Sequence, residues 1–568
     1  MADLVSRFAH KLFAGALLAG VACTGSGGSG TAPAIAKTPP PAAAEAVSEA
    51  PPLFDGLGSH HFAIATSVPL AQQYFDQGLA QTYGFNHAKA IRDFAYAAKL
   101  DPNCAICSWG VALAHGPNIN MPMVGDAGKL AWEALQEAEA RAPHASPLER
   151  DLIAALAKRY AAEAPAERAA LDRAYADAMI ALRAKHPENV DIAVLAAEAI
   201  MDVTPWSYWD EKLAPRELTP TAAEYLEWAL AREPAHLGAN HYYIHLMELP
   251  APQKAEAAAD RLLKLAPDAG HLVHMPSHIY YRVGRYQDAV TANIDAARAD
   301  EALFALCGPN NYPVYGALYY PHNVHFIWAA ASAQGESERA ITEARRLAAI
   351  VEPQFAAFPP VEDYLPIPVL TLARFGRWDA VLAEPAPPAG RIYQGGVWHY
   401  ARGLAHARLG HSADAEQELA AVDAAAALPT AETTIVGGGF VNAATLLGLA
   451  SHHLAGEIAA ASGDATGAID SIEAAVAAQD ALPYTEPPPW YMPTRQALGA
   501  VLLQAGRASE AEAVYRKDLE QYPKNGWSLY GLAQALHAQG KAEQAAWAEQ
   551  GFAQAWAHAD VKLSASRF

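Results

Sequence analysis

The hydrophobic positions of this chain recur with the spacing of short amphipathic helices, and no stretch shows the strict alternation of a half-buried strand. Between helical segments, a glycine is repeatedly followed five residues later by an alanine. The pairs are Gly284/Ala289, Gly335/Ala340, Gly410/Ala415, Gly463/Ala468, Gly506/Ala511 and Gly540/Ala545. Glycine can end a helix at a tight turn, and the small alanine lets the next helix pack closely. The pattern predicts an all-α chain of helix–turn–helix units.

Other small and aromatic residues keep a constant order around these pairs. They are Tyr74, Gly78, Ala90, Phe94, Ala97 and Pro102 in the first unit, and Gly499, Tyr515 and Pro523 in a later one. With these landmarks the chain resembles the tetratricopeptide-repeat (TPR) family, whose unit has ~34 residues. Matching stretches lie near 71–104, 270–303, 321–354, 396–429, 449–482 and 492–559. The resemblance implies a right-handed α-solenoid over residues 53–568, with the first helix of each pair lining a concave groove.

The amino terminus has the pattern of an export signal over residues 1–23. Arg7 and Lys11 precede an apolar stretch that is too short to span a membrane. Cys23, which follows it, resembles the lipid-attachment cysteine of bacterial lipoproteins, and ordinary cleavage near Ala36 is the alternative. An Ala/Pro/Gly-rich linker over 24–52 comes next. We therefore expect an exported, periplasmic protein whose contact with a membrane is limited to a lipid anchor at Cys23.

Charge and cysteine content exclude some classes of function. The chain has 61 acidic and 40 basic residues and a formal net charge of -21, without a basic cluster, so nucleic acid is not an expected partner. Only Cys104, Cys107 and Cys307 remain after the leader, too few for a fold held by disulfides. Cys104 and Cys107 are compatible with a local disulfide, with half of a metal site, or with small buried residues at a helix start, which we favour.

Histidines follow helical spacing in two neighbouring segments. His241, His245 and Glu248 share one helix face. On the next segment, His271, His274, His278 and Tyr281 do the same. Counting back from the alanine landmarks extends this pattern to other repeats. His274, His325 and His453 each stand 15 residues before the alanine of their repeat. His271 and His322 stand 18 residues before it, and His278 and Glu457 stand 11 residues before it.

Neutral imidazole is the commonest protein ligand for transition metals, and histidines one helical turn apart converge on one ion. We therefore predict a groove that binds Zn, Cu or Fe. The predicted ligands are His241, His245, His271, His274, His278, His322 and His325. Catalytic roles are assigned to Glu248, Tyr281 and Glu457, and a metal-dependent hydrolase and an oxidoreductase both remain open. The alternative is an interaction scaffold, in which these histidines pack or hydrogen-bond and the groove binds a peptide or a partner protein.

Two segments interrupt the repeats and are candidates for contacts with a small molecule or a peptide. The first, between Asp300 and Pro321, contains Tyr312 and Tyr315; the second runs from Tyr484 to Trp490. The predicted groove residues are His453, Tyr312, Tyr315, Glu486, Trp490 and Arg495. Aromatic clusters at 83–87, 115–122 and 202–209 either belong to the core, which we favour, or form the far wall of a pocket. Both interrupting segments are equally compatible with simple spacers between repeats.

Overall fold

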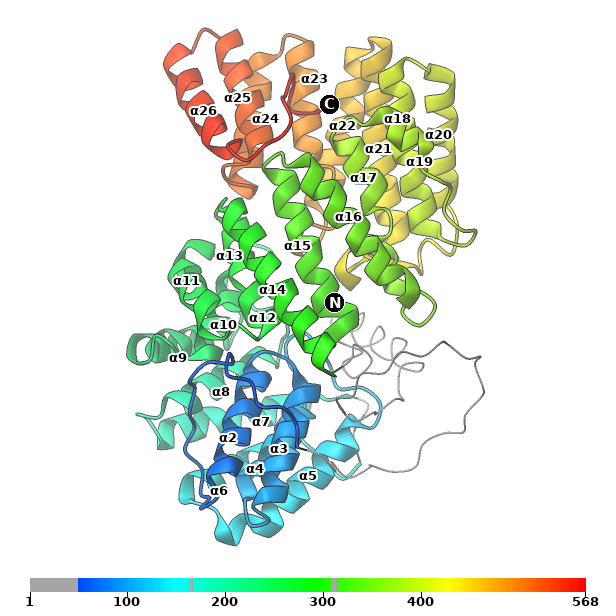
Figure 1. The fold of residues 1–568 in the computed structure, drawn as a ribbon. Coiled ribbons are helices and arrows are strands. Elements are labelled where there is room, and N and C mark those ends of the chain that lie inside the picture. Colours follow the sequence, from blue (N-terminus) through cyan, green and yellow to red (C-terminus); the bar gives the residue numbers. More distant parts are fainter. Residues whose placement is uncertain (1–49, 164, 166, 308–314) are drawn as a thin grey trace. The chain divides into compact units, whose positions relative to one another are not determined.

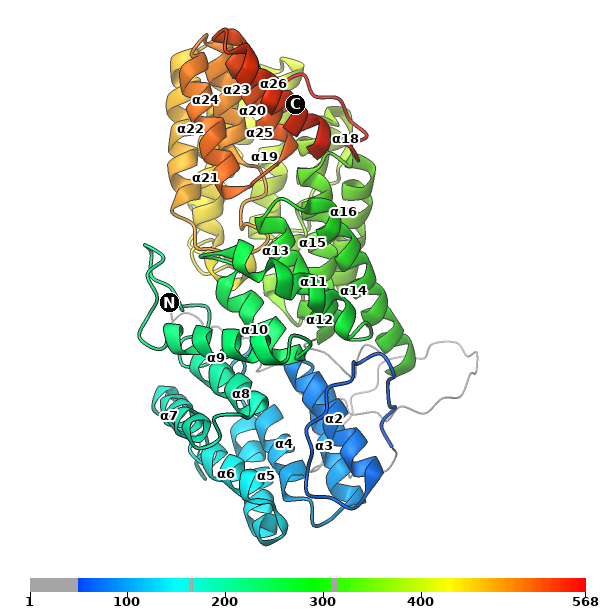
Figure 2. The same cartoon turned by 90° about the vertical axis from the view of Figure 1, so that its left-hand side faces the viewer.

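The computed structural model describes residues 50–163, 165, 167–307 and 315–568, and they form two compact units. The amino-terminal unit comprises residues up to 279 together with 295–320, and the carboxy-terminal unit comprises 280–294 and 321–568. The predicted leader, Cys23, the linker up to residue 49 and Tyr312 lie outside the described residues. Each unit is described by itself below, and Figures 1 and 2 show its helices.

The amino-terminal unit consists of helices joined by turns and loops. They are α2 (Pro69–Tyr83), α3 (His87–Leu100), α4 (Ala105–Ala114), α5 (Ala127–Arg141), α6 (Pro147–Leu156), α7 (Ala169–Lys185), α8 (Val190–Met201), α9 (Thr219–Arg232), α10 (Leu237–Met247), α11 (Glu256–Leu265) and α12 (Gly270–His274). The division between the units falls inside α13 (Pro276–Arg282) and α14 (Tyr286–Cys307). A π-helical turn at Tyr315–Tyr319 completes the amino-terminal unit.

The carboxy-terminal unit is a series of helical hairpins (Figure 2). Its helices are α15 (Tyr320–Ala333), α16 (Ser337–Val351), α17 (Ile367–Arg374), α18 (Trp378–Ala383), α19 (Ile392–Leu409), α20 (Ser412–Ala426), α21 (Ala443–Ser462), α22 (Ala465–Asp480), α23 (Thr494–Gln504), α24 (Ala508–Gln521), α25 (Gly526–Ala538) and α26 (Ala542–Ala555). From α19 onward, consecutive helices make the most extensive packing. Helix pairing between neighbours in sequence is the arrangement that the repeat pattern predicts.

The turn glycines confirm the predicted turns between helices. Their φ values are +75° at Gly284, +80° at Gly335, +78° at Gly410, +85° at Gly463, +74° at Gly506 and +71° at Gly540. This left-handed region is open to glycine at no steric cost, whereas a side chain would be strained. The alanine five residues after each glycine is fully buried in all six pairs. The all-α class and the TPR-like helix pairs are therefore confirmed in the described residues.

Two local features differ from the sequence expectation or complete it. Ile435–Val436 pairs with Val441–Asn442 as a short antiparallel ribbon, β1 and β2, which no alternating pattern predicted because each strand has only two residues. Cys104 and Cys107 are buried at the start of α4, as the favoured interpretation had it, and they also form a disulfide. Among the described residues, none of the helices has the length and apolar character needed to span a bilayer.

Candidate metal centre

Three histidines of the amino-terminal unit lie together in its interior. His241 and His245 stand one turn apart on α10, and His271 comes from α12. Their exposed fractions are 0%, 3% and 2%, so water does not solvate the rings. One ring nitrogen from each histidine lies within 4.8 Å of the other two. The structure thus brings together three of the seven predicted ligands, including the pair whose i,i+4 spacing identified it.

Hydrogen bonds determine which nitrogen two of these rings offer to the centre of the cluster. His241 donates Nδ1–H to the carbonyl oxygen of Tyr83 at 2.6 Å, and His245 Nδ1 lies 3.3 Å from Glu248 Oε1. Because each Nδ1 donates its proton to an acceptor, each Nε2 keeps its lone pair. Within the described ranges, neither Nε2 has a hydrogen-bond partner, and neither ring nitrogen of His271 has one. A buried polar atom without a partner lowers the stability of the folded state by about 1–3 kcal/mol. A ligand shared by the three histidines would remove this loss for each of them.

The charge state of these histidines suits a cation at the centre of the cluster. Burial lowers the pKa of His241 and His271 well below the usual value, and neighbouring histidines lower it further. Burial also lowers the pKa of His245, against the opposing effect of Glu248. The three rings are therefore neutral near pH 7. Neutral imidazole is the form that coordinates a metal ion.

An aromatic wall covers the three rings and comes from the loop after α2. The Phe85 ring lies 4.5 Å from His241, 5.3 Å from His271 and 6.0 Å from His245, measured between centroids. Phe85 has a φ of +56°, a conformation that costs a residue with a side chain about 1–3 kcal/mol and that clusters at functional sites. Tyr83 and Phe85 are buried, as the favoured interpretation of the 83–87 segment as core had it, and the Phe85 ring also covers the three histidines.

Two further aromatic side chains complete the surroundings. Trp206 packs edge-on against His245 at 5.1 Å and is 37% exposed, and Tyr319 packs edge-on against His271 at 4.6 Å. The predicted groove residue Tyr315 accepts the backbone N–H of His271 through its hydroxyl at 2.8 Å. Trp206 and Tyr319 belong to segments flagged only as aromatic clusters or insertions, because helical spacing cannot identify a residue that arrives from a loop.

The next predicted ligands extend the cluster outward through Glu248. Glu248 Oε2 lies 2.8 Å from His278 Nδ1, and His278 Nε2 lies 3.0 Å from His274 Nε2. Burial alone would raise the pKa of Glu248, but the charge of His278 and hydrogen bonds from His245 and His278 lower it to about 2. Glu248 is therefore a carboxylate that orients His245. His274 and His278 continue the hydrogen-bonded chain behind it.

A second histidine group, not found from the sequence, lies near the same loop. His60 Nε2 is 2.9 Å and His236 Nε2 is 3.3 Å from Asp191 Oδ1. His236 Nδ1 accepts the N–H of Ala239 at 3.2 Å, so the proton of His236 is on Nε2 and points at Asp191. The His236 ring is therefore a hydrogen-bond donor to this carboxylate, and its Nε2 has no lone pair to offer a metal there. Their three sequence segments are far apart, and no spacing pattern links them.

The remaining predicted residues belong to the carboxy-terminal unit and lie in several different environments. His453 bonds to the Tyr400 hydroxyl at 2.9 Å and lies 3.7 Å from Glu457, which also forms ion pairs with Arg408 and Arg567 at 2.5 Å each. These contacts place Glu457 in a buried charge network.

The others are also held by local contacts. His322 packs edge-on against Phe326 at 5.0 Å. Arg495 pairs with Asp480 and Glu486 with Arg282. Trp490 is 1% exposed and packs against Tyr400. Tyr281 lines a separate pocket described below.

His325 is a buried histidine in an aromatic cage and not part of the three-histidine cluster. Its ring stacks on Trp328 at 5.3 Å and meets Tyr364 and Tyr491 edge-on at 5.1 Å and 5.2 Å. No described residue forms a hydrogen bond with its Nε2. Burial lowers the pKa of His325 to about 3. The equal repeat offset of His274, His325 and His453 therefore fixes their place on a helix but not their neighbours.

The His325 cage leads to a prediction about pH. An unfolded histidine takes up a proton below about pH 6.5. Folded His325 does so only near pH 3, so its contribution to stability is complete above pH 6.5 and declines as the pH falls. We expect His325→Phe to reduce the loss of unfolding free energy between pH 7 and pH 5 by about 2 kcal/mol, measured by denaturant titration. Exposed His452→Phe is the control, and an equal effect of both changes would contradict the prediction.

Comparisons with known proteins find matches among solved structures and not among family models or curated proteins. Similar solved structures include yeast Tom70 (12% identity, 83% of this chain and 89% of that one, TM-score 0.28) and a human IFIT1 dimer with PPP-AAAA (11%, 84% and 88%, 0.31). The P58(IPK) TPR domain is another (11%, 84% and 99%, 0.21). At these TM-scores the likeness carries no role over to this chain. The helix pairs, turn glycines and buried alanines define a TPR-like helical-repeat protein.

Proposed function

We propose that this TPR-like protein holds one transition metal ion through His241, His245 and His271. The observation that carries the proposal is the convergence of three buried, neutral imidazoles, each of which has a ring nitrogen without a hydrogen-bond partner among the described residues. In a tetrahedral zinc site, ligand nitrogens stand about 3.3 Å apart. Small side-chain rotations from the present separation of up to 4.8 Å would reach this geometry. An all-imidazole set suits Zn, Cu or Fe.

Three protein ligands are the number that catalytic zinc sites use, since a fourth position is then free for water or a substrate atom. A metal ion held there would lower the pKa of a bound water or polarise a substrate oxygen. Within this proposal Glu248 positions His245 and raises its basicity, as carboxylates behind metal-bound histidines do. Hydrolysis and redox chemistry both stay open, because both use a three-nitrogen site.

The proposed site belongs to an exported protein. The amino-terminal signal pattern is one support for export. The Cys104–Cys107 disulfide is the other, because disulfides persist mainly in oxidising compartments. Detection of the mature chain in the periplasmic fraction of its host would test this part, and a cytoplasmic chain with reduced cysteines would contradict it.

Metal content of the purified full chain tests the proposal directly. We expect one equivalent of Zn, Cu or Fe by elemental analysis, or one saturable site for Zn²⁺ when the metal-free protein is titrated by calorimetry. Zn²⁺ at 100 times its dissociation constant should stabilise the fold by about 2.7 kcal/mol, seen as a higher unfolding temperature. Absence of stoichiometric binding for all three metals would refute it.

The helical-repeat fold itself favours a second function, that of an interaction scaffold. Repeat proteins present the inner helices of successive pairs as one extended binding surface. In that case the buried histidines would be packing residues, and the fold would bind a peptide or partner protein without any metal. A metal-free chain with unchanged stability in the presence of Zn²⁺, Cu²⁺ and Fe²⁺ would make this the better account.

A further inference from the structure

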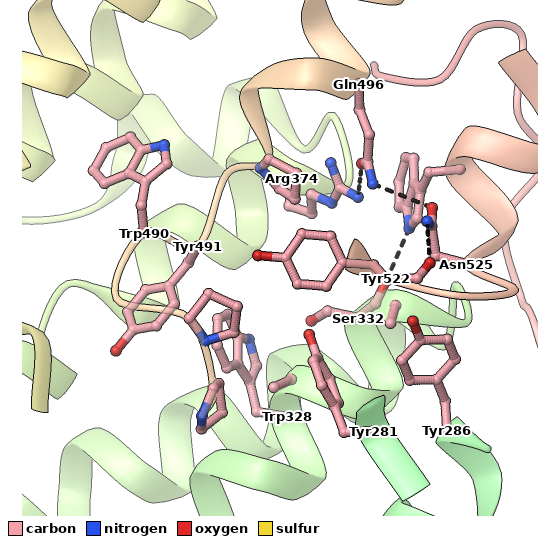
Figure 3. A pocket seen from close by; sticks show the side chains of 16 residues that line it. Tyr281, Tyr286, Trp328, Ser332, Arg374, Trp490, Tyr491, Gln496, Tyr522 and Asn525 are labelled. Carbon is pink, nitrogen blue, oxygen red and sulfur yellow. Dashed lines mark hydrogen bonds between the residues drawn. The ribbon is translucent and has the colours of Figure 1, made fainter. Parts of the chain in front are cut away.

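The carboxy-terminal unit contains an aromatic pocket that no predicted metal ligand lines. Its space, including the open mouth, is about 540 Å³. Figure 3 shows the side chains around it. The aromatic residues that line it include Tyr281, Trp328, Tyr491, Tyr522, Trp527 and the predicted groove residue Trp490. Planar apolar walls on several sides favour a ligand with a flat apolar body.

One cation projects into this pocket from the end of α17. The guanidinium of Arg374 donates from Nη2 to Gln496 Oε1 and lies over the Trp527 ring at 3.7 Å. Among the described residues, no carboxylate lies within ion-pair distance of it. Burial lowers the pKa of Arg374 to about 10, against the effect of Asp518, and the group is still charged at neutral pH. A partly buried guanidinium has five N–H donors, and the protein supplies an acceptor for one of its nitrogens.

The carboxylate that would be the natural partner of Arg374 has other donors. Asp518 accepts the Ser528 hydroxyl at 2.5 Å, Asn525 Nδ2 at 3.2 Å and Gln496 Nε2 at 3.3 Å. Gln496 therefore stands between Arg374 and Asp518 and bonds to both. An unpaired charge in a poorly solvated site is unfavourable. The charge of Arg374 would therefore be neutralised by an anionic group that enters from the pocket.

Neutral hydrogen-bonding groups accompany the cation. In Figure 3 the side chains of Arg374, Tyr281 and Tyr522 converge on the same space. Burial raises the pKa of both tyrosines, and nearby acidic groups raise it further, so their hydroxyls stay protonated and able to donate. A carboxylate matches the planar fork of a guanidinium and accepts additional O–H donors.

We infer that this pocket binds a small carboxylic acid with an aromatic body. Its carboxylate lies on Arg374, and its ring lies among Trp328, Tyr491 and Tyr281. The inference is independent of the metal site because every residue that carries it belongs to the carboxy-terminal unit.

Matched acid and amide probes test the inference on the unmodified chain. Benzoate and 3-phenylpropionate are titrated against benzamide and 3-phenylpropionamide, with tryptophan fluorescence as the signal for Trp328 and Trp527. We expect saturable binding of at least one acid and binding at least ~10-fold weaker for its amide, the loss of about 1.4 kcal/mol that a charge-assisted hydrogen bond represents. Equal binding of acid and amide, or no saturation by either acid at ~10 mM, would overturn the inference.

A matched pair of variants locates the site. Arg374→Met should abolish binding of the acid, while Arg377→Gln, an exposed arginine beside the same helix that pairs with Glu338, should leave it unchanged. Arg374→Lys, which keeps the charge but not the planar fork, covers the case in which Arg374→Met fails to fold, and it should weaken binding measurably. Equal effects at positions 374 and 377 would contradict the inference. So would binding of a carboxylate-terminated peptide without binding of either small acid.

Discussion

His271→Ala is expected to lower the affinity of this protein for Zn²⁺ by about 100-fold or more. His271 is the one member of the three-histidine cluster that comes from α12, and both of its ring nitrogens lack a partner in the part of the chain that the structure describes. Without it, only two imidazoles from α10 remain, and the site keeps too few protein ligands for tight binding. Removing even a residue that only orients a ligand typically costs 10–100-fold, so loss of a ligand should cost at least the upper figure.

His325→Ala is the matched control for this experiment. His325 is also buried and also has an Nε2 without a partner, but it lies in an aromatic cage of the other unit. Competition with a chromophoric chelator gives the dissociation constant for each variant. Glu248→Gln should give an intermediate loss, because it removes no proposed ligand and acts on the cluster through the orientation of His245. Retained affinity in His271→Ala, or an equal loss in His325→Ala, would show that the cluster is not the metal site.

Gly531→Ala is expected to destabilise the carboxy-terminal unit, although glycine to alanine in a helix normally stabilises. The Tyr515 ring is fully buried between two glycines. A Cβ at Gly531 would lie 2.2 Å from Tyr515 Cζ, and one at Gly499 would lie 2.3 Å from it. Ser566 fixes the hydroxyl end of the ring at 2.7 Å, so the ring cannot move away. Overpacking of this kind costs about 1–3 kcal/mol, more than the ~1 kcal/mol that alanine gains in a helix.

Gly448→Ala in α21 supplies the opposite expectation. Nothing lies within 4 Å of a Cβ built there, and its backbone is helical, so this substitution should raise stability by up to about 1 kcal/mol. Thermal unfolding of both variants against the wild type measures the difference. If both shift the unfolding temperature in the same direction, the ring does not fill the space between the two glycines as described.

The agreement of sequence and structure is best where the cause is local. A turn that needs positive φ selects glycine, and the following helix can approach only over a small residue, so the Gly/Ala pairs mark helix ends wherever they occur. Helical i,i+4 spacing, which is also a local property, placed His241 and His245 on one face of α10. The short ribbon at 435–442 was missed because three consecutive glycines, Gly437, Gly438 and Gly439, make a turn between strands too short to show alternation.

The composition of the site could be predicted only in part. His274, His325 and His453 stand at the same position in their repeats, which predicts equivalent surroundings. In the structure, however, the ring of His274 lies next to a histidine, that of His325 next to a tryptophan and that of His453 next to a tyrosine. Repeat register fixes which way a side chain leaves its helix. It carries no information about the loops and other helices that reach the same point.

The sequence by itself determined the helical class, the turns, the buried alanines and the i,i+4 pair His241 and His245, because each depends on residues within one or two helical turns. Only the tertiary structure decided that His271 joins that pair, that Phe85 covers it and that the Tyr83 carbonyl fixes the tautomer of His241. Tyr83 and His241 are 158 residues apart, and contacts over such separations depend on the packing of whole helices. The convergence of unpartnered ring nitrogens is likewise a property of the folded interior, since in an unfolded chain water would bond to each of them.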